Sequence, residues 1–380
     1  PGAVLCRVVK SFVRIAQLEL FAKRHEFAEM TMLADFAIMR EFPLLLSAKD
    51  VTRNAAGDVV SIAAGAPERY VALFKAIADA TSTLVVDWIR VGYCQGNMNS
   101  DNCLIAGRTL DYGPYGMVER FDPTYQPFTS DQDGKFSFLQ QPQAMHVNIV
   151  VLGDSFIALL KHRCAELGIS AEETSKHVAE VETYRKEGFG SLFQQKYKRM
   201  KRCKLGLDGF GAEEEAMHQE LEQLMYDSDV DYTIFYRQLS QLCSSDLPAE
   251  ALTRLQEAFY EYDKTMESES VRERWHTWLG SYLKRVLDQE RRGESEDEDG
   301  MDSTTRVTLM NKTNPKYILR NWMATKAYEQ ELNGYTGASV VTELTELLSE
   351  PYQEQPDLAA KWYKRTPSWA EDMPGVAFMS

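Results

Sequence analysis

The sequence lacks the features that mark several common protein classes. Its six cysteines include no Cys-x-x-Cys pair, and its six histidines show no metal-binding spacing. A zinc ribbon and a disulfide scaffold are therefore not expected. No apolar run reaches the ~18 residues that a membrane helix needs. The longest candidate, 149–160, is too short and carries Asp154, so we expect no membrane partner.

Positive charge is also in short supply. The chain has 42 Lys and Arg residues against 57 Asp and Glu residues, a net charge of −15. We therefore expect no broad nucleic-acid surface, although a local basic pocket for a nucleotide is still possible. The basic stretch 196–204 is interpreted as the exposed face of an amphipathic helix, with Tyr197 and Met200 turned inward.

Hydrophobic residues make up 44% of the chain and charged residues 26%, which is ordinary for a globular protein. Apolar residues at helical spacing predict helices over 18–39 and 68–91, a largely helical region over 146–292, and a last helix over 315–332. Gly, Asn, Ser and Asp interrupt short apolar pieces between 92 and 116, where we expect a loop and a strand pair that turns at Gly107. The predicted fold class is α+β, mainly α-helical.

The same texture suggests four regions along the chain. We expect a catalytic region over 1–145, a helical region over 146–292, an acidic linker over 293–305, and a C-terminal helix and tail over 306–380. A short strand is predicted at residues 1–9.

The stretch Gly96-Asn-Met-Asn-Ser-Asp-Asn102, followed by Asp111-Tyr-Gly113, carries the most chemistry. Asp111 lies 111 − 101 = 10 residues after Asp101. Two short strands and a turn between them would return Asp111 to the side of Asn102. A carboxylate and an amide oxygen would then share one cation, and oxygen ligands suit Mg²⁺. Asp101 could orient or deprotonate an attacking hydroxyl.

The same residues also occur in ordinary turns, so a plain turn cluster is the alternative. Loop, strand pair and Asp-aromatic-Gly follow the order of a protein-kinase C-lobe. In the usual kinase pattern about four residues separate the catalytic Asp from the metal-binding Asn. Asp101 and Asn102 are adjacent, so an ordinary kinase loop is not present.

Several motifs spread over essentially the whole chain fit one known family pattern. The matching segments are Gln95–Asn102, Gly107–Gly116, Pro1–Arg7, Ser11–Arg14, Ser137–Pro142, Lys204–Leu207, Asp231–Thr233 and Asn314–Asn321. Together they resemble the selenoprotein O family. Gln95 and Asn97 depart from the His and Val of the usual family form, but neither change removes a metal ligand.

The resemblance implies a kinase-like fold that binds ATP with its α-phosphate toward the acceptor. AMP would pass to Ser, Thr or Tyr hydroxyls of protein substrates, with Mg²⁺ or Mn²⁺ as the metal. Asp101 matches the family's catalytic base, and Asn102 and Asp111 match its metal ligands. Arg7 and Arg14 match two arginines that contact the nucleotide, which Asp111 also helps to bind through the metal.

The two arginines have a physical interpretation as well. Guanidinium groups can fork onto phosphate oxygens, so Arg7 and Arg14 suit a nucleotide. The alternative is that both form surface salt bridges.

The resemblance further implies that most of the N-lobe, with its glycine-rich loop, lysine and glutamate, precedes residue 1. It also implies a Cys or selenocysteine after Ser380, where a codon read as a stop, or a truncation, would end the chain. The family location is mitochondrial in eukaryotes and cytoplasmic in bacteria. Two other functions stay open, a kinase-like transfer of the γ-phosphate and a non-catalytic pseudokinase scaffold.

Overall fold

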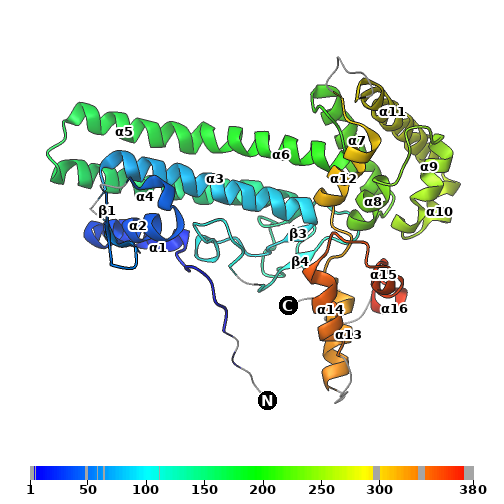
Figure 1. Cartoon of the computed structure of the whole chain (residues 1–380), viewed down its shortest axis with the longest axis horizontal. Helices are drawn as coiled ribbons and strands as arrows, with labels where there is room; N and C mark the ends of the chain where they lie inside the picture. Colours follow the sequence, from blue (N-terminus) through cyan, green and yellow to red (C-terminus); the bar gives the residue numbers. More distant parts are fainter. Residues whose placement is uncertain are drawn as a thin grey trace. The chain divides into compact units, whose positions relative to one another are not determined.

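The protein is represented by a computed structural model. It describes residues 4, 6–47, 50–57, 59–62, 65–110, 112–293, 300–332 and 339–371. Across these residues the chain is mainly helical, with two small antiparallel sheets of two strands each (Figure 1). The expectation of a mainly α-helical α+β protein is confirmed.

The chain divides into two compact units, and each combines segments that are distant in sequence. Unit 1 comprises Pro1–Val86, Asn97–Tyr112 and Gln141–Lys196. Unit 2 comprises Asp87–Gly96, Gly113–Gln140 and Tyr197–Ser380. The four-region division expected from composition stays a prediction.

Helices form most of unit 1, with one small sheet and one 3-10 turn in the predicted catalytic loop. Its elements are α1 (Ile15–Lys23), α2 (Phe27–Glu41), η1 (Pro43–Leu45), β1 (Val51–Arg53), β2 (Val59–Ile62), α3 (Pro67–Val91, entering unit 2 at its end), η3 (Ser100–Asn102), α4 (Gln141–Glu166), α5 (Ala171–Thr183), the π-helix η5 (Tyr184–Gly188) and the start of α6 (Phe189–Leu205).

The predicted helix over 18–39 is in fact two helices, α1 and α2. The break falls at His25, whose φ of 57° lies in the left-handed region. Such a backbone conformation cannot continue a right-handed helix. Hydrophobic spacing continues across the break, which is why the sequence pattern suggested one helix. The helix expected over 68–91 is confirmed as α3.

Helix α4 is the centre of unit 1, since α1, α2 and α5 all pack against it. Phe74 of α3 meets Phe156 of α4 at a ring-centroid distance of 5.6 Å. Figure 1 shows α3, α4 and α5 running side by side. Buried aromatic and aliphatic side chains of this kind supply most of the stability of a helical layer.

In the described part of the chain, one helix has the length and composition of a membrane span, contrary to expectation. It covers Phe138–Glu166, with a mean hydropathy of 1.5 over its most apolar window. Mean hydropathy tolerates the isolated charge of Asp154, which had divided the run in the sequence. Just over half of that window, 56%, is buried inside the protein, as in a core helix, and we assign it no membrane role.

Unit 2 contains the second small sheet and the remaining helices. Its elements are β3 (Tyr93–Cys94), β4 (Gly116–Met117), η4 (Phe138–Gln140), α7 (Ala212–Asp227), α8 (Tyr232–Leu239), α9 (Pro248–Arg254), η6 (Gln256–Ala258), α10 (Tyr262–Glu267), α11 (Glu269–Gly293), α12 (Ser303–Thr313), α13 (Asn321–Leu332), α14 (Val340–Ser349), α15 (Pro356–Trp362) and α16 (Ser368–Glu371).

An aromatic core holds the helices around α11, which packs against α7, α9 and α10. Trp275 and Trp278 of α11 are both buried, as their helical spacing predicts. Trp278 stacks on Tyr282 at 5.3 Å, and Phe259 meets the edge of Trp275 at 5.2 Å.

The basic stretch 196–204 is only partly exposed. Lys201 and Lys204 are buried, which corrects the expectation of a solvated basic face. Lys204 places its ammonium 3.9 Å from the ring centroid of Tyr236 and donates a 2.8 Å hydrogen bond to the carbonyl of Arg90. Burial holds the pKa of Lys204 well below its usual value. The tyrosine ring and the Arg90 carbonyl replace water around the ammonium, which explains how this lysine can belong to the apolar face.

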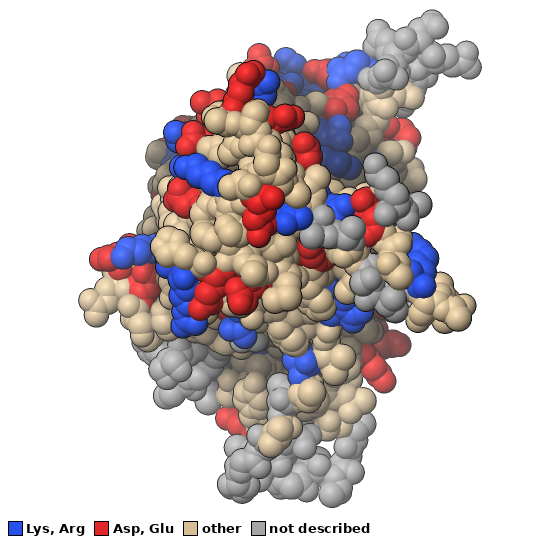
Figure 2. Space-filling model, turned by 90° about the vertical axis from the view of Figure 1, so that its left-hand side faces the viewer, with Lys and Arg blue, Asp and Glu red and all other residues tan. Residues whose placement is uncertain are grey.

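Figure 2 shows one face of the molecule, on which acidic and basic side chains are interspersed rather than gathered by sign. The expectation, drawn from net charge, that no broad nucleic-acid surface is present stays a prediction.

Two further boundaries differ from those predicted. The described residues between 4 and 9 form no strand. The last predicted helix begins at Asn321 rather than at 315, because the preceding segment is extended. The amides of Lys316 and Tyr317 both donate to the carbonyl of Pro351, at 2.8 and 3.1 Å.

A buried ion triad terminates that extended segment. Arg320, whose side chain is 4% exposed, donates to both carboxylate oxygens of Asp231 at 2.6 and 3.0 Å, and to Glu119 at 3.1 Å. Burial raises the pKa of Glu119, and the charge of Asp231 raises it further, while Arg320 opposes both. The guanidinium is therefore the counter-charge that allows two carboxylates to be buried together.

We expect Arg320→Met to lower the free energy of unfolding by about 3–5 kcal/mol, because two buried carboxylates would lose their partner. Denaturant unfolding measures the loss. Arg274→Met is a matched control, since Arg274 also bridges two carboxylates, Glu220 and Asp227, but at the surface. That change should cost no more than about 1 kcal/mol. Equal losses in the two variants would contradict the role given to the buried triad.

Candidate functional site

The predicted catalytic loop is a short 3-10 turn with a well-bonded main chain. Asn97 accepts a hydrogen bond from the amide of Asn99 at 3.1 Å through its side-chain oxygen. The amide of Asn102 then donates to the carbonyl of Asn99 at 2.8 Å, closing η3. The loop conformation is therefore fixed by Asn97 and the backbone.

A narrow hairpin follows, as the sequence predicts. Cys103 and Thr109 form an antiparallel bridge, and the chain reverses at Gly107, whose φ is +63°. A Cβ at Gly107 would lie 2.3 Å from the carbonyl oxygen of Ala80 on α3. Glycine is required here both by the left-handed backbone and by this close approach.

The N-terminal segment adds a third strand-like piece to this hairpin. Residues 13–15 pair with residues 103–105 through main-chain hydrogen bonds of 2.9 and 3.1 Å. Arg14 lies opposite Leu104 in an antiparallel bridge. Helix α1, which begins directly after Arg14, packs against η3. Arg14 is therefore held beside the predicted catalytic loop by backbone pairing.

Arg7 reaches the other strand of the same hairpin. Its guanidinium donates a 2.7 Å hydrogen bond to the carbonyl of Thr109 and lies 5.8 Å from the ring centroid of Tyr112. Arg7 is exposed and is not on a strand, which corrects the expected placement. Neither Arg7 nor Arg14 forms an ion pair with a carboxylate of the described residues. The salt-bridge alternative has no support there.

The side chains of Asp101 and Asn102 are available to a ligand. Asp101 is exposed and Asn102 half-buried. Within the described ranges, neither the Asp101 carboxylate nor the Asn102 amide group forms a hydrogen bond. In a plain turn, the Asp101 carboxylate would cap a backbone amide. Asp111, the third residue predicted here, lies outside the described residues.

Sequence reasoning missed two residues that fix the site from outside. Asn148 of α4 is buried and donates to the carbonyl of Met98 at 2.8 Å, just before the loop. Arg108 pairs at 2.6 Å with Glu41, whose side chain is only 2% exposed, and so ties the hairpin turn to α2. For Asn148, the sequence signal was a lone Asn near the start of an apolar helix. For Arg108, no signal in the sequence pointed to this contact.

The cysteines close to this segment are structural. Cys94 and Cys103 are buried, as expected for small core thiols. Burial raises the pKa of each thiol to about 12, and the charge of Asp101 contributes at Cys103. Almost no thiolate exists at neutral pH, so neither cysteine is poised for redox chemistry.

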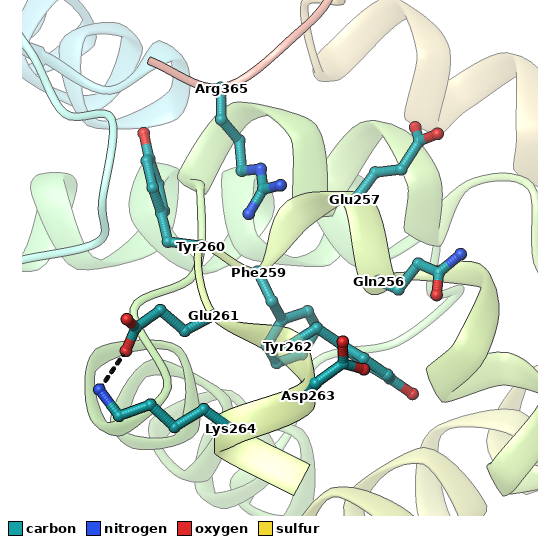
Figure 3. A pocket seen from close by; sticks show the side chains of 9 residues that line it. All are labelled: Gln256, Glu257, Phe259, Tyr260, Glu261, Tyr262, Asp263, Lys264 and Arg365. Carbon is teal, nitrogen blue, oxygen red and sulfur yellow. Dashed lines mark hydrogen bonds and ion pairs between the residues drawn. The ribbon is translucent and has the colours of Figure 1, made fainter. Parts of the chain in front are cut away.

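A surface pocket of about 520 Å³ lies in unit 2 (Figure 3). Several of its charged side chains are already engaged: Glu261 accepts a 2.6 Å bond from Lys264, and Arg365 lies 5.3 Å from the ring centroid of Tyr260. None of the predicted site residues lines it. The pocket is therefore not assigned to the nucleotide.

The chain is similar to known proteins over most of its length. A family model described as "Protein adenylyltransferase SelO" matches residues 1–349. The chain is 32% identical over 381 residues to a protein nucleotidyltransferase YdiU from Aromatoleum aromaticum. It is 32% identical over 382 residues to one from Flavobacterium johnsoniae and 33% identical over 388 residues to one from Rhodopirellula baltica.

Each of these alignments covers 100% of this chain but only 63–64% of the relative. The chain thus spans a little under two thirds of the length of the curated relatives it matches.

We expect Gly107→Ala to disrupt the hairpin, because alanine would combine an unfavourable left-handed backbone with a contact to Ala80 that is too short. The free energy of unfolding should fall by at least about 1 kcal/mol, and amide exchange should accelerate over 99–110. Gly190→Ala on α6 is the control, because a Cβ there meets nothing within 4 Å. It should be neutral or stabilise by up to about 1 kcal/mol. Unchanged exchange in the Gly107 variant would contradict the geometry described.

Proposed function

We propose, since the chain belongs to the SelO protein adenylyltransferase family, that it carries the metal and phosphate site of an enzyme that transfers AMP from ATP to protein hydroxyls. One observation carries the proposal. Two arginines from the N-terminal segment meet the hairpin that carries Asp101 and Asn102, at Thr109 and at Leu104. Guanidinium groups and oxygen ligands together suit a metal-bound polyphosphate.

The donor set fits magnesium or manganese. The amide oxygen of Asn102 has no other partner among the described residues, and oxygen donors are what a hard divalent cation prefers. Asp111 is the second ligand in this proposal, and the antiparallel bridge of Cys103 with Thr109 agrees with the hairpin from which the sequence predicts it. Arg7 and Arg14 would hold the phosphates. The metal, when bound, neutralises phosphate charge.

The chemistry assigned to this chain is general-base catalysis by Asp101. Its carboxylate would take the proton of a Ser, Thr or Tyr hydroxyl as that oxygen attacks the α-phosphorus of ATP. A bond forms between the hydroxyl oxygen and the α-phosphorus, and the bond to the β-phosphate oxygen breaks. Pyrophosphate leaves and AMP stays on the protein. An exposed carboxylate with no hydrogen bond from the described residues is free to make this transfer.

A kinase-like C-lobe with ATP reversed is the fold proposal that goes with this chemistry. The order of loop, hairpin and Asp-aromatic-Gly supports it. The named relatives are bacterial, which favours the cytoplasmic alternative for location. Nothing in the structure or the relatives supports the mitochondrial location. A following selenocysteine stays a prediction, and residues 372–380 lie outside the described residues.

Separate labelling of the α- and γ-phosphates of ATP tests the transfer. With the natural full-length protein and a protein acceptor, the α-label should become acid-stable on protein, and a mass increase of AMP should appear. Omitting divalent metal should abolish both signals. Incorporation of the γ-label alone would replace this proposal with a kinase-type reaction. Incorporation of neither label would favour a non-catalytic scaffold.

Asp101→Asn should lower single-turnover AMP transfer by about 100- to 10,000-fold, the usual range for loss of a general base. ATP affinity and melting temperature should stay close to those of the unchanged protein, because the carboxylate acts in the transition state. Asn102→Ala should instead weaken ATP binding as well.

Asp122→Asn is the turn-type control. Asp122 accepts bonds from the amide and hydroxyl of Thr124, both at 2.7 Å, so its loss should lower stability without a selective loss of transfer. If Asp101→Asn behaves like this control, Asp101 is a turn residue and not a base.

A further inference from the structure

We propose a second metal site, for a divalent transition metal such as Zn²⁺, in which Glu68, Glu173 and His177 are the ligands. One ligand atom from each residue lies within 4.8 Å of the other two. Glu173 and His177 stand one turn apart on α5, and Glu68 comes from the first turn of α3. All three belong to unit 1, and nothing in the proposed AMP transfer uses them.

The state of His177 is the observation that separates this cluster from ordinary surface acids. The residue is only 8% exposed, and its Nε2 atom is buried without a hydrogen bond. Nε2 lies 3.4 Å from Oε1 of Glu68, but the geometry is not that of a hydrogen bond. A buried polar nitrogen without a hydrogen bond is costly. Coordination of a cation would satisfy it.

Glu173 has a carboxylate to offer as well. As the third residue of α5 it is placed to complete a capping box with Ser170. Only half of that motif is present: the Ser170 hydroxyl accepts from the Glu173 amide at 3.2 Å. Among the described residues the Glu173 carboxylate forms no ion pair. It is exposed, and one of its carboxylate oxygens lies within 4.8 Å of a ring nitrogen of His177.

The spacing fits coordination after a modest closure. Ligand atoms about 2.0–2.2 Å from a tetrahedral zinc lie roughly 3.3–3.6 Å apart. Glu68 and His177 already have that separation. One imidazole with two carboxylates suits zinc and its neighbours, whereas Mg²⁺ prefers oxygen ligands alone. Three protein ligands leave a coordination position for water.

Such a site would act as a cross-link between α3 and α5. One contact already joins these helices further along, the Lys75–Glu180 ion pair at 2.5 Å, and Lys75 also forms a cation–π contact with Tyr184 of η5, directly after α5. A metal at Glu68 would fasten their first turns in the same way. A ligand that binds only the folded state raises stability by mass action.

The test is zinc binding by the metal-stripped 380-residue chain, without ATP and with excess Mg²⁺ to occupy the oxygen site. Equilibrium dialysis with metal analysis should find one tight zinc, and zinc should raise the melting temperature. His177→Ala and Glu173→Gln should each weaken this binding at least tenfold, a loss no smaller than the roughly 10- to 100-fold that removing an outer-shell partner costs. Both variants should also lose the zinc-dependent rise in melting temperature.

His162→Ala is the matched control. His162 lies one turn from Glu166 on α4, with Nε2 and Oε1 3.3 Å apart. The other carboxylate oxygen of Glu166 is paired with Arg163, a cation, where a metal site would need another ligand. The variant should bind zinc like the unchanged chain. Co²⁺ in place of zinc should give visible d–d bands without the near-ultraviolet band of a thiolate ligand.

Absence of tight zinc, full retention of it in Glu173→Gln, or a cobalt–thiolate band would each overturn the proposal. Glu173→Gln changes an exposed side chain and should fold normally. It therefore tests the site even if His177→Ala fails to fold. The readouts contain no AMP transfer, so failure here and failure of the proposed function are separate results.

Discussion

The candidate site depends on one short piece of main-chain pairing, between residues 13–15 and residues 103–105 of unit 1. Without it, the hairpin after η3 would be two isolated strands joined at Cys103 and Thr109, and so small a hairpin is not stable alone. The pairing also brings Arg14 to the loop. Arg14 and Asp101 are almost ninety residues apart in the sequence, and two backbone hydrogen bonds bring their segments together.

This same hairpin shows which features could be predicted from the sequence. Local chemistry was enough to predict the turn at Gly107, because glycine is favoured where the backbone becomes left-handed. Burial of Cys94, Cys103, Trp275 and Trp278 followed from residue type and spacing in the same way. The roles proposed for Asp101 and the arginines came from the family resemblance, since turn chemistry alone left a plain turn cluster open.

What could not be predicted depends on partners distant in sequence. His25 carries no signal that it will adopt a positive φ, so one helix was expected where two form. Lys201 and Lys204 looked like solvated charges because helical spacing says nothing of Glu215 or of the tyrosine rings that receive them. The extended segment before Asn321 is explained only by its bonds to the carbonyl of Pro351.

The loop also shows how a site can be rigid and open at once. Its main chain is held by Asn97, Asn148 and the strand-like pairing, whereas the side chains of Asp101 and Asn102 stay unbonded among the described residues. An unbonded polar group costs little while water reaches it, but would be costly if buried. Exposure of Asp101 is therefore what makes an unpaired carboxylate tolerable.

Mg²⁺ gives up its waters reluctantly, so a metal arriving at such a solvated loop could keep part of its hydration shell. Protein ligands then need to supply only a few oxygens, and the phosphates the rest. A fixed backbone with few, water-exposed oxygen donors suits a metal that enters with its nucleotide better than one held permanently.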